Sequence, residues 1–103
     1  MKENDKKPIV IYCIKQFGTT QQPVGDTIGF FTDLDDAKEC VTKNSGDMAE
    51  GGYYPYAVIF PVQEGLYNFP SPEVERWYVW IKSENAYIQT SRPDFMEGWA
   101  LSI

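Results

Sequence analysis

The sequence contains no histidine, the residue that most often serves as a general base and as a metal ligand. Serine and cysteine nucleophiles need a neighbouring base, and no Ser-x-x-Lys pattern supplies one instead. Residues 33–38 also fail the calcium-loop pattern, because Ala37 and Lys38 stand where a ligand and a glycine are required. We therefore predict that the chain is not an enzyme and has no catalytic residues, no metal site and no cofactor.

Basic residues are scarce as well. Nine Lys and Arg against fifteen Asp and Glu give a net charge of −6, so we expect no direct binding to nucleic acid. The longest apolar run, 9–14, is far shorter than a membrane-spanning helix, and we expect no membrane association. Cys13 and Cys40 form no Cys-x-x-Cys pair and lie in apolar patterns, which indicates reduced thiols and a cytoplasmic protein.

Five apolar segments have the β-branched and aromatic composition of strands, and one segment has helical periodicity. The predicted strands cover 8–17, 27–31, 53–62, 76–82 and 86–90, and the predicted helix covers about 33–45. This order favours an α+β fold, a two-layer domain with a mostly antiparallel four- to five-stranded sheet and one main helix. We expect residues 1–7 to be a flexible N-terminal segment and residues 8–103 to form a single α+β domain. The apolar tail 91–103 should fold back on its core.

Local chemistry adds four expectations. Thr32 or Asp33 can serve as the N-cap of the helix by accepting a hydrogen bond from a first-turn N–H. Gly29 indicates a bulge or a close backbone approach in its strand. Pro61 cannot donate to a sheet, which implies an edge position or a bulge. The Tyr54–Pro55 bond is a candidate for the cis form.

The motifs GFFTDLDDAKECV, YPYAVI, EGLY and WYVW follow one another in a fixed order. In this order the chain, over about residues 10–82, resembles a family of short, uncharacterised open reading frames from bacteria and their phages. The resemblance implies a small accessory protein of a bacterial host or of a phage-infected cell. It brings no activity with it.

Negative charge is concentrated in one quarter of the chain, since residues 26–50 carry a net charge of −5. Clustered carboxylates steer a protein toward a basic partner, and in a sharper form they imitate the phosphates of a nucleic acid. This interpretation predicts a small acidic protein that engages a basic surface of a protein partner, such as a phage-type inhibitor of a nucleic-acid-binding host system. The predicted contact residues are Asp33, Asp35, Asp36, Glu39, Asp47 and Glu50. A solvated helix face with an acidic first turn explains the same pattern and stays open.

Aromatic residues supply an alternative. Because neighbouring residues of a strand point to opposite sides, Trp77 and Tyr78 cannot both face the helix. Exposed aromatic side chains around Trp77, Tyr78 and Trp80 would suit a homodimer or another homo-oligomer, or a small-ligand module. The loop 63–75 and the tail could instead cover that face of the sheet.

Overall fold

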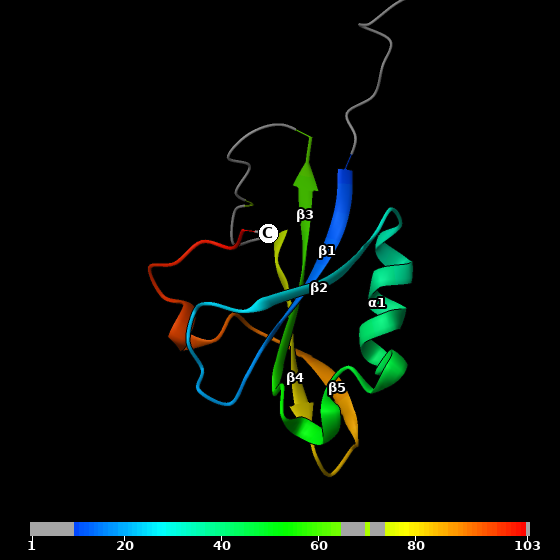
Figure 1. Ribbon diagram of the computed structural model, residues 1–103, viewed down its shortest axis with the longest axis vertical. Helices are drawn as coiled ribbons and strands as arrows, with labels where there is room; N and C mark the ends of the chain where they lie inside the picture. The colour runs from blue at the N-terminus through cyan, green and yellow to red at the C-terminus, as the bar shows by residue number, and fades with distance from the viewer. Residues whose placement is uncertain (1–9, 65–69, 71–73, 103) are drawn as a thin grey trace, which may run out of the picture.

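The computed structural model describes residues 10–64, 70 and 74–102, and it has five antiparallel strands and one α-helix (Figure 1). The elements are β1 (Val10–Phe17), β2 (Asp26–Phe31), α1 (Leu34–Thr42), β3 (Tyr56–Gln63), β4 (Arg76–Ile81) and β5 (Ala86–Thr90). The strands lie in the order β2-β1-β3-β4-β5. The predicted α+β fold, a single domain with an antiparallel five-stranded sheet and one helix, is confirmed. The expectations for residues 1–7 and for a domain start at residue 8 lie outside the described residues.

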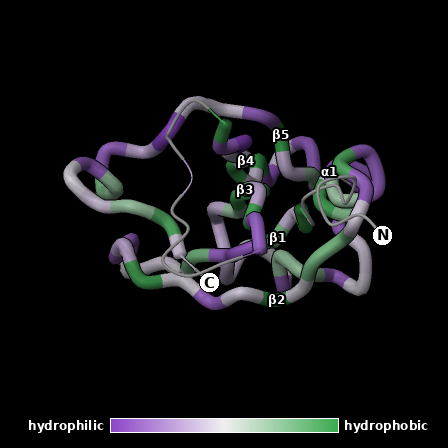
Figure 2. The backbone as a smooth tube through the Cα atoms, turned by 90° about the horizontal axis from the view of Figure 1, so that it is seen from above, coloured by the Kyte–Doolittle hydropathy of each residue, from purple (hydrophilic) through white to green (hydrophobic). Residues whose placement is uncertain are grey.

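Both sides of the sheet carry a core. Helix α1 lies on one side and the C-terminal segment on the other, as Figures 1 and 2 show. Strand β1 contributes to both cores, because Ile14 points toward the helix while its neighbour Cys13 points toward the C-terminal segment. Strand β1 is therefore an inner strand that is covered on both faces.

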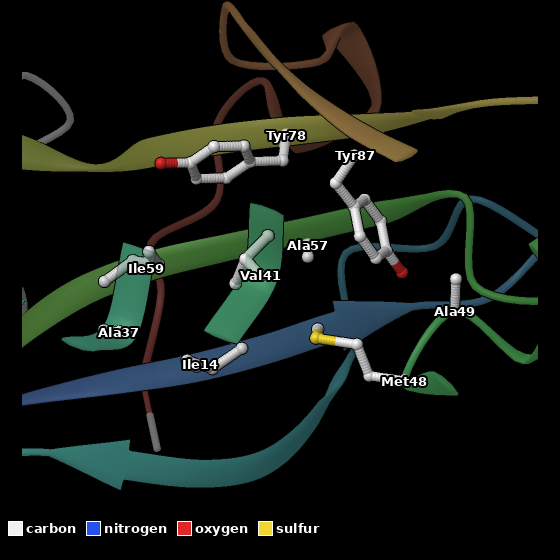
Figure 3. Packing of buried hydrophobic residues seen from close by; sticks show 9 residues of the cluster. All are labelled: Ile14, Ala37, Val41, Met48, Ala49, Ala57, Ile59, Tyr78 and Tyr87. Atoms are coloured by element: carbon white, nitrogen blue, oxygen red, sulfur yellow. The ribbon is translucent and has the colours of Figure 1, made fainter. Parts of the chain in front are cut away.

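The helix-side core fills the space between the sheet and α1 (Figure 3). From the helix, Ala37 and Val41 are fully buried. They pack with buried side chains of the sheet and of the turns after the helix, namely Ile14, Met48, Ala49, Ala57, Ile59, Tyr78 and Tyr87. Burying a side chain such as Val41 contributes about 1.5–3 kcal/mol, so this core holds α1 on the sheet.

The opposite core is closed by the C-terminal segment, as predicted for the apolar tail. Met96 and Leu101 are fully buried against side chains of three strands, namely Cys13, Phe17, Val58, Phe60 and Trp77. A 3₁₀ turn (η5, Asp94–Met96) directs Met96 inward. The Lys15 Nζ donates to the carbonyl oxygen of Ser102 at 2.5 Å, which holds the end of the segment over β1.

Helix α1 begins at a side-chain cap and ends at a left-handed residue. The Asp33 Oδ1 accepts hydrogen bonds from the backbone N–H of Asp35 at 2.8 Å and of Asp36 at 3.3 Å, so Asp33 is the N-cap. The helix ends at Thr42, three residues before the predicted end near 45, because Asn44 adopts a positive φ of 49° that no α-helix continues through. Two short 3₁₀ turns follow, η2 (Ser45–Asp47) and η3 (Glu50–Gly52).

Two strand positions are irregular, one beside Gly29 and one at Pro61. Strand β2 has an extra residue, Ile28, between the pairs Ile14–Gly29 and Lys15–Thr27, so the bulge expected beside Gly29 is confirmed. Pro61 pairs with β1, but the pairing of β3 with β4 ends at Ile59, which makes Pro61 a local edge.

Strand β3 begins three residues later than predicted, because Tyr54 still belongs to the turn after η3. Its backbone N–H donates to the carbonyl oxygen of Ala49 at 3.2 Å. None of the described peptide bonds is cis, so the cis form suggested for Tyr54–Pro55 is wrong. The chain enters β3 directly from this hydrogen-bonded turn, so no change of chain direction by a cis peptide bond is needed at Pro55.

Candidate binding surface

The six predicted contact residues are all exposed. They are distributed along α1, its N-cap and the two turns after the helix. We call them the acidic surface: Asp33, Asp35, Asp36, Glu39, Asp47 and Glu50. The first four lie on the helix or at its cap, and the last two lie on η2 and η3. The helix and its cap thus display four of the seven carboxylates that the sequence places in 26–50.

The carboxylates of this surface differ in what they contact. The Glu39 Oε2 pairs with the Lys43 Nζ at 2.5 Å, and this hydrogen bond lowers the pKa of Glu39. Asp47 accepts a hydrogen bond from the Asn44 amide at 3.1 Å. The side chains of Asp35 and Asp36 have no hydrogen bond or ion pair with any described residue. These two carboxylates are therefore available to a partner, whereas Asp33 is used as the helix cap.

A shallow groove separates one flank of α1 from the end of β2. On the helix, Asp36, Glu39, Cys40 and Lys43 lie at positions i, i+3, i+4 and i+7, so they share one side. Phe31 of β2 and Ser45 complete the lining of this groove, which has a volume of about 340 Å³. We call it the β2–α1 groove. Sequence reasoning missed it, because a helical repeat does not show which strand the charged flank will face.

The aromatic residues of the alternative do not share an exposed face. Trp77 and Tyr78 are each only 2% exposed, and Trp80 is half-buried. Trp77 packs under the C-terminal segment, whereas Tyr78 lies in the helix-side core and Trp80 packs on Tyr87 with ring centroids 5.3 Å apart. The tail, which the sequence left open as a possible cover, buries Trp77, since Met96 of the tail lies in the same core as Trp77.

Apolar exposure occurs instead on β2. Phe30 is 60% exposed and Ile28 is 43% exposed, although the sequence predicts only a strand over 27–31 there. Phe30 lies opposite Cys13 and therefore points to the side of the sheet away from α1. The signal that could have found these residues is the short length of the strand beside a glycine, which is typical of an edge.

A buried ion pair fixes the C-terminal segment rather than forming a reactive site. The Glu75 side chain is 1% exposed, and its Oε1 accepts from the Trp77 indole at 2.7 Å and from the Arg92 Nε at 2.9 Å. Arg92 also donates to the carbonyl oxygen of Trp99. The Glu75 Oε2 is buried without a hydrogen-bond partner among the described residues. This network joins β4 to the tail, and sequence spacing gave no hint of it.

The two cysteines are free thiols on opposite sides of the sheet, Cys13 in the core under the tail and Cys40 beside the helix-side core. Burial raises the pKa of the Cys13 thiol, although the charge of Lys15 opposes this shift. Within residues 10–64, 70 and 74–102, no three His, Cys, Asp or Glu side chains gather as a metal site would require. In the same part of the chain, no helix has the length and apolarity needed to cross a membrane.

Comparison of the chain with protein-family models, with curated proteins and with solved structures gives no match. We therefore infer function from the acidic surface, the β2–α1 groove and the exposed side chains of β2.

Proposed function

We propose that the chain is a non-enzymatic binding protein whose acidic surface engages a basic surface of a protein partner. The observation that carries this proposal is the exposure of all six carboxylates, with the side chains of Asp35 and Asp36 free of hydrogen bonds and ion pairs within the described structure. Helix capping explains Asp33, and the helix dipole favours acids in the first turn, but neither needs Glu39, Asp47 or Glu50.

Clustered negative charge acts first on the rate of encounter. Exposed carboxylates on one element attract a basic partner and raise the association rate, and salt screens this attraction. The concrete form we propose is an inhibitor, of bacterial or phage origin, that occupies a basic nucleic-acid site of a cytoplasmic host protein. In that site, the carboxylates of α1 would stand where phosphates normally bind.

The test reverses the two free carboxylates. In the variant Asp35→Lys/Asp36→Lys, we expect association with the partner captured from the native host to slow about tenfold at low salt. The matched control, Glu84→Lys/Glu97→Lys, makes the same charge change at exposed residues outside the acidic surface. Stopped-flow or surface-based kinetics at low and high salt measure the rates. Equal rates for both variants, or an association that salt leaves unchanged, would contradict the proposal.

A further inference from the structure

Strand β2 is an edge of the sheet, since it pairs with β1 and with no other described strand. The second edge is β5. The outer backbone groups of an edge strand can pair with another extended chain, and peptide recognition commonly uses this mode. The two edges differ in the side chains that they offer to an incoming strand.

The edge at β2 offers different chemistry on its two sides. On the side away from α1, Phe30 gives an exposed apolar surface next to the half-exposed Ile28. On the side of the helix, Phe31 borders the β2–α1 groove, whose lining includes Asp36 and the Glu39–Lys43 ion pair, so Asp36 is the unpaired carboxylate there. Ile88 of β5 is also exposed, but the pocket at the end of that strand is lined by Thr90 with both Arg92 and Asp94, so its charges balance.

An extended segment matches this arrangement, because its side chains alternate between two sides with a period of two residues. We propose, on the basis of the proposed function, that the basic partner contributes an extended segment that pairs with β2 as a sixth strand. Basic side chains of that segment enter the β2–α1 groove, and the apolar side chains between them cover Phe30. The partner is thus recognised by alternating basic and apolar residues in an extended conformation.

A second copy of this chain fits the same edge poorly. Antiparallel pairing of two β2 strands about Gly29 and Phe30 brings Asp26 of one copy opposite Asp33 of the other, and like charges in such positions repel. The bulge at Ile28 also shortens the regular part of the edge, which leaves Gly29–Phe31 as its ordered ladder. So short a ladder needs the added attraction of the carboxylates.

The experiment uses a capped hexapeptide of alternating lysine and valine as the probe. Its control is the same peptide methylated at every backbone nitrogen, which keeps the side chains and the charge but removes the hydrogen-bond donors. Titrated into the full chain labelled with ¹⁵N, the first peptide should shift the amide signals of 28–32 and of the groove residues. We expect the methylated peptide to bind at least about tenfold more weakly.

Two exposed positions provide matched variants. Phe30→Ser should weaken binding of the lysine–valine peptide about fivefold, whereas Ile88→Ser on the other edge should leave it unchanged. Asp36→Lys should weaken it about tenfold.

Four outcomes would overturn the proposal that a segment of alternating basic and apolar residues adds to β2. The first is equal binding of both peptides at α1, which leaves the acidic surface as the contact and keeps the proposed function. The second is no binding of either peptide while the Asp35→Lys/Asp36→Lys variant still loses the natural partner. The third is β2 signals that move with protein concentration alone, which identifies a second copy as the occupant. The fourth is binding at β2 that Asp36→Lys does not change, which removes the charge selection as well.

Discussion

Tyr87 is a buried titratable side chain whose pKa depends on its local surroundings. Its side chain is buried in the helix-side core, and its hydroxyl donates to the carbonyl oxygen of Tyr54 at 2.6 Å. Burial raises the pKa of Tyr87 far above its ordinary value of 10.0, and the charge of Asp47 adds to this shift, while a hydrogen bond with Gln16 opposes it. The fold therefore requires the neutral phenol.

This requirement makes stability depend on alkaline pH. A pKa that folding raises gives stability that is complete below the unfolded pKa and is lost as the pH rises above about 10. We expect Tyr87→Phe to lower the free energy of unfolding by about 1 kcal/mol at pH 7, because the Tyr54 carbonyl loses its hydrogen-bond donor. Between pH 8 and 11, the free energy of unfolding of this variant should fall less than that of the wild type. Urea unfolding at several pH values measures this. Tyr53→Phe, at an exposed tyrosine, should keep the wild-type profile, and a Tyr87→Phe profile parallel to wild type would contradict the argument.

Residue roles with partners nearby in the sequence were predictable, and roles with distant partners were not. The cap at Asp33 and the bulge at Gly29 depend on neighbours within a few positions, so local chemistry indicated both. Lys15 reads as an ordinary polar residue, yet its Nζ contacts Ser102, 87 positions away. The pKa of Lys15 is lowered, first by burial, against the opposing charge of Asp26.

At the scale of elements, the start of α1 gives a sharp test, since the sequence left two candidates for its cap. Asp33→Ala removes the acceptor for two backbone N–H groups and should lower the free energy of unfolding by about 1 kcal/mol. Thr32→Ala, at the exposed residue before it, should change that free energy by less than about 0.5 kcal/mol. Urea denaturation of both variants measures the difference. An equal loss in the two would show that Asp33 is not the cap in solution.

The strands were predicted within three residues at each described end, because runs of β-branched and aromatic residues with prolines and glycines between them mark strands. The site was predicted less well. All six acidic residues are exposed as a surface must be, but the groove beside β2 arises from the packing of α1 against a strand that precedes it. Local patterns contain no information about that packing, although the short strand beside Gly29 is a signal for the edge on which Phe30 stays uncovered.

At the scale of the whole molecule, one sheet separates two cores that share no buried side chain. The sequence indicated the helix-covered side and left open whether the tail or a partner covers the other. The structure closes that side with Met96 and Leu101, whose contacts with Phe17 and Phe60 join distant parts of the chain. This closure removes Trp77 from the surface, whereas Phe30 and Ile28 of β2 stay exposed.

Because the two cores are separate but lie on one sheet, we expect substitutions in them to lower the free energy of unfolding independently. We also expect the chain to unfold in a single transition. Val41→Ala in the helix-side core should cost roughly 2 kcal/mol, and Leu101→Ala in the opposite core should cost about 2–5 kcal/mol. Because the two side chains share no partners, the double variant should lose the sum to within about 0.5 kcal/mol. Thermal and urea unfolding, followed by circular dichroism and by tryptophan fluorescence, measure all three variants. Coincident transitions support one cooperative domain, whereas early loss of the fluorescence signal in Leu101→Ala would show that the C-terminal segment unfolds by itself.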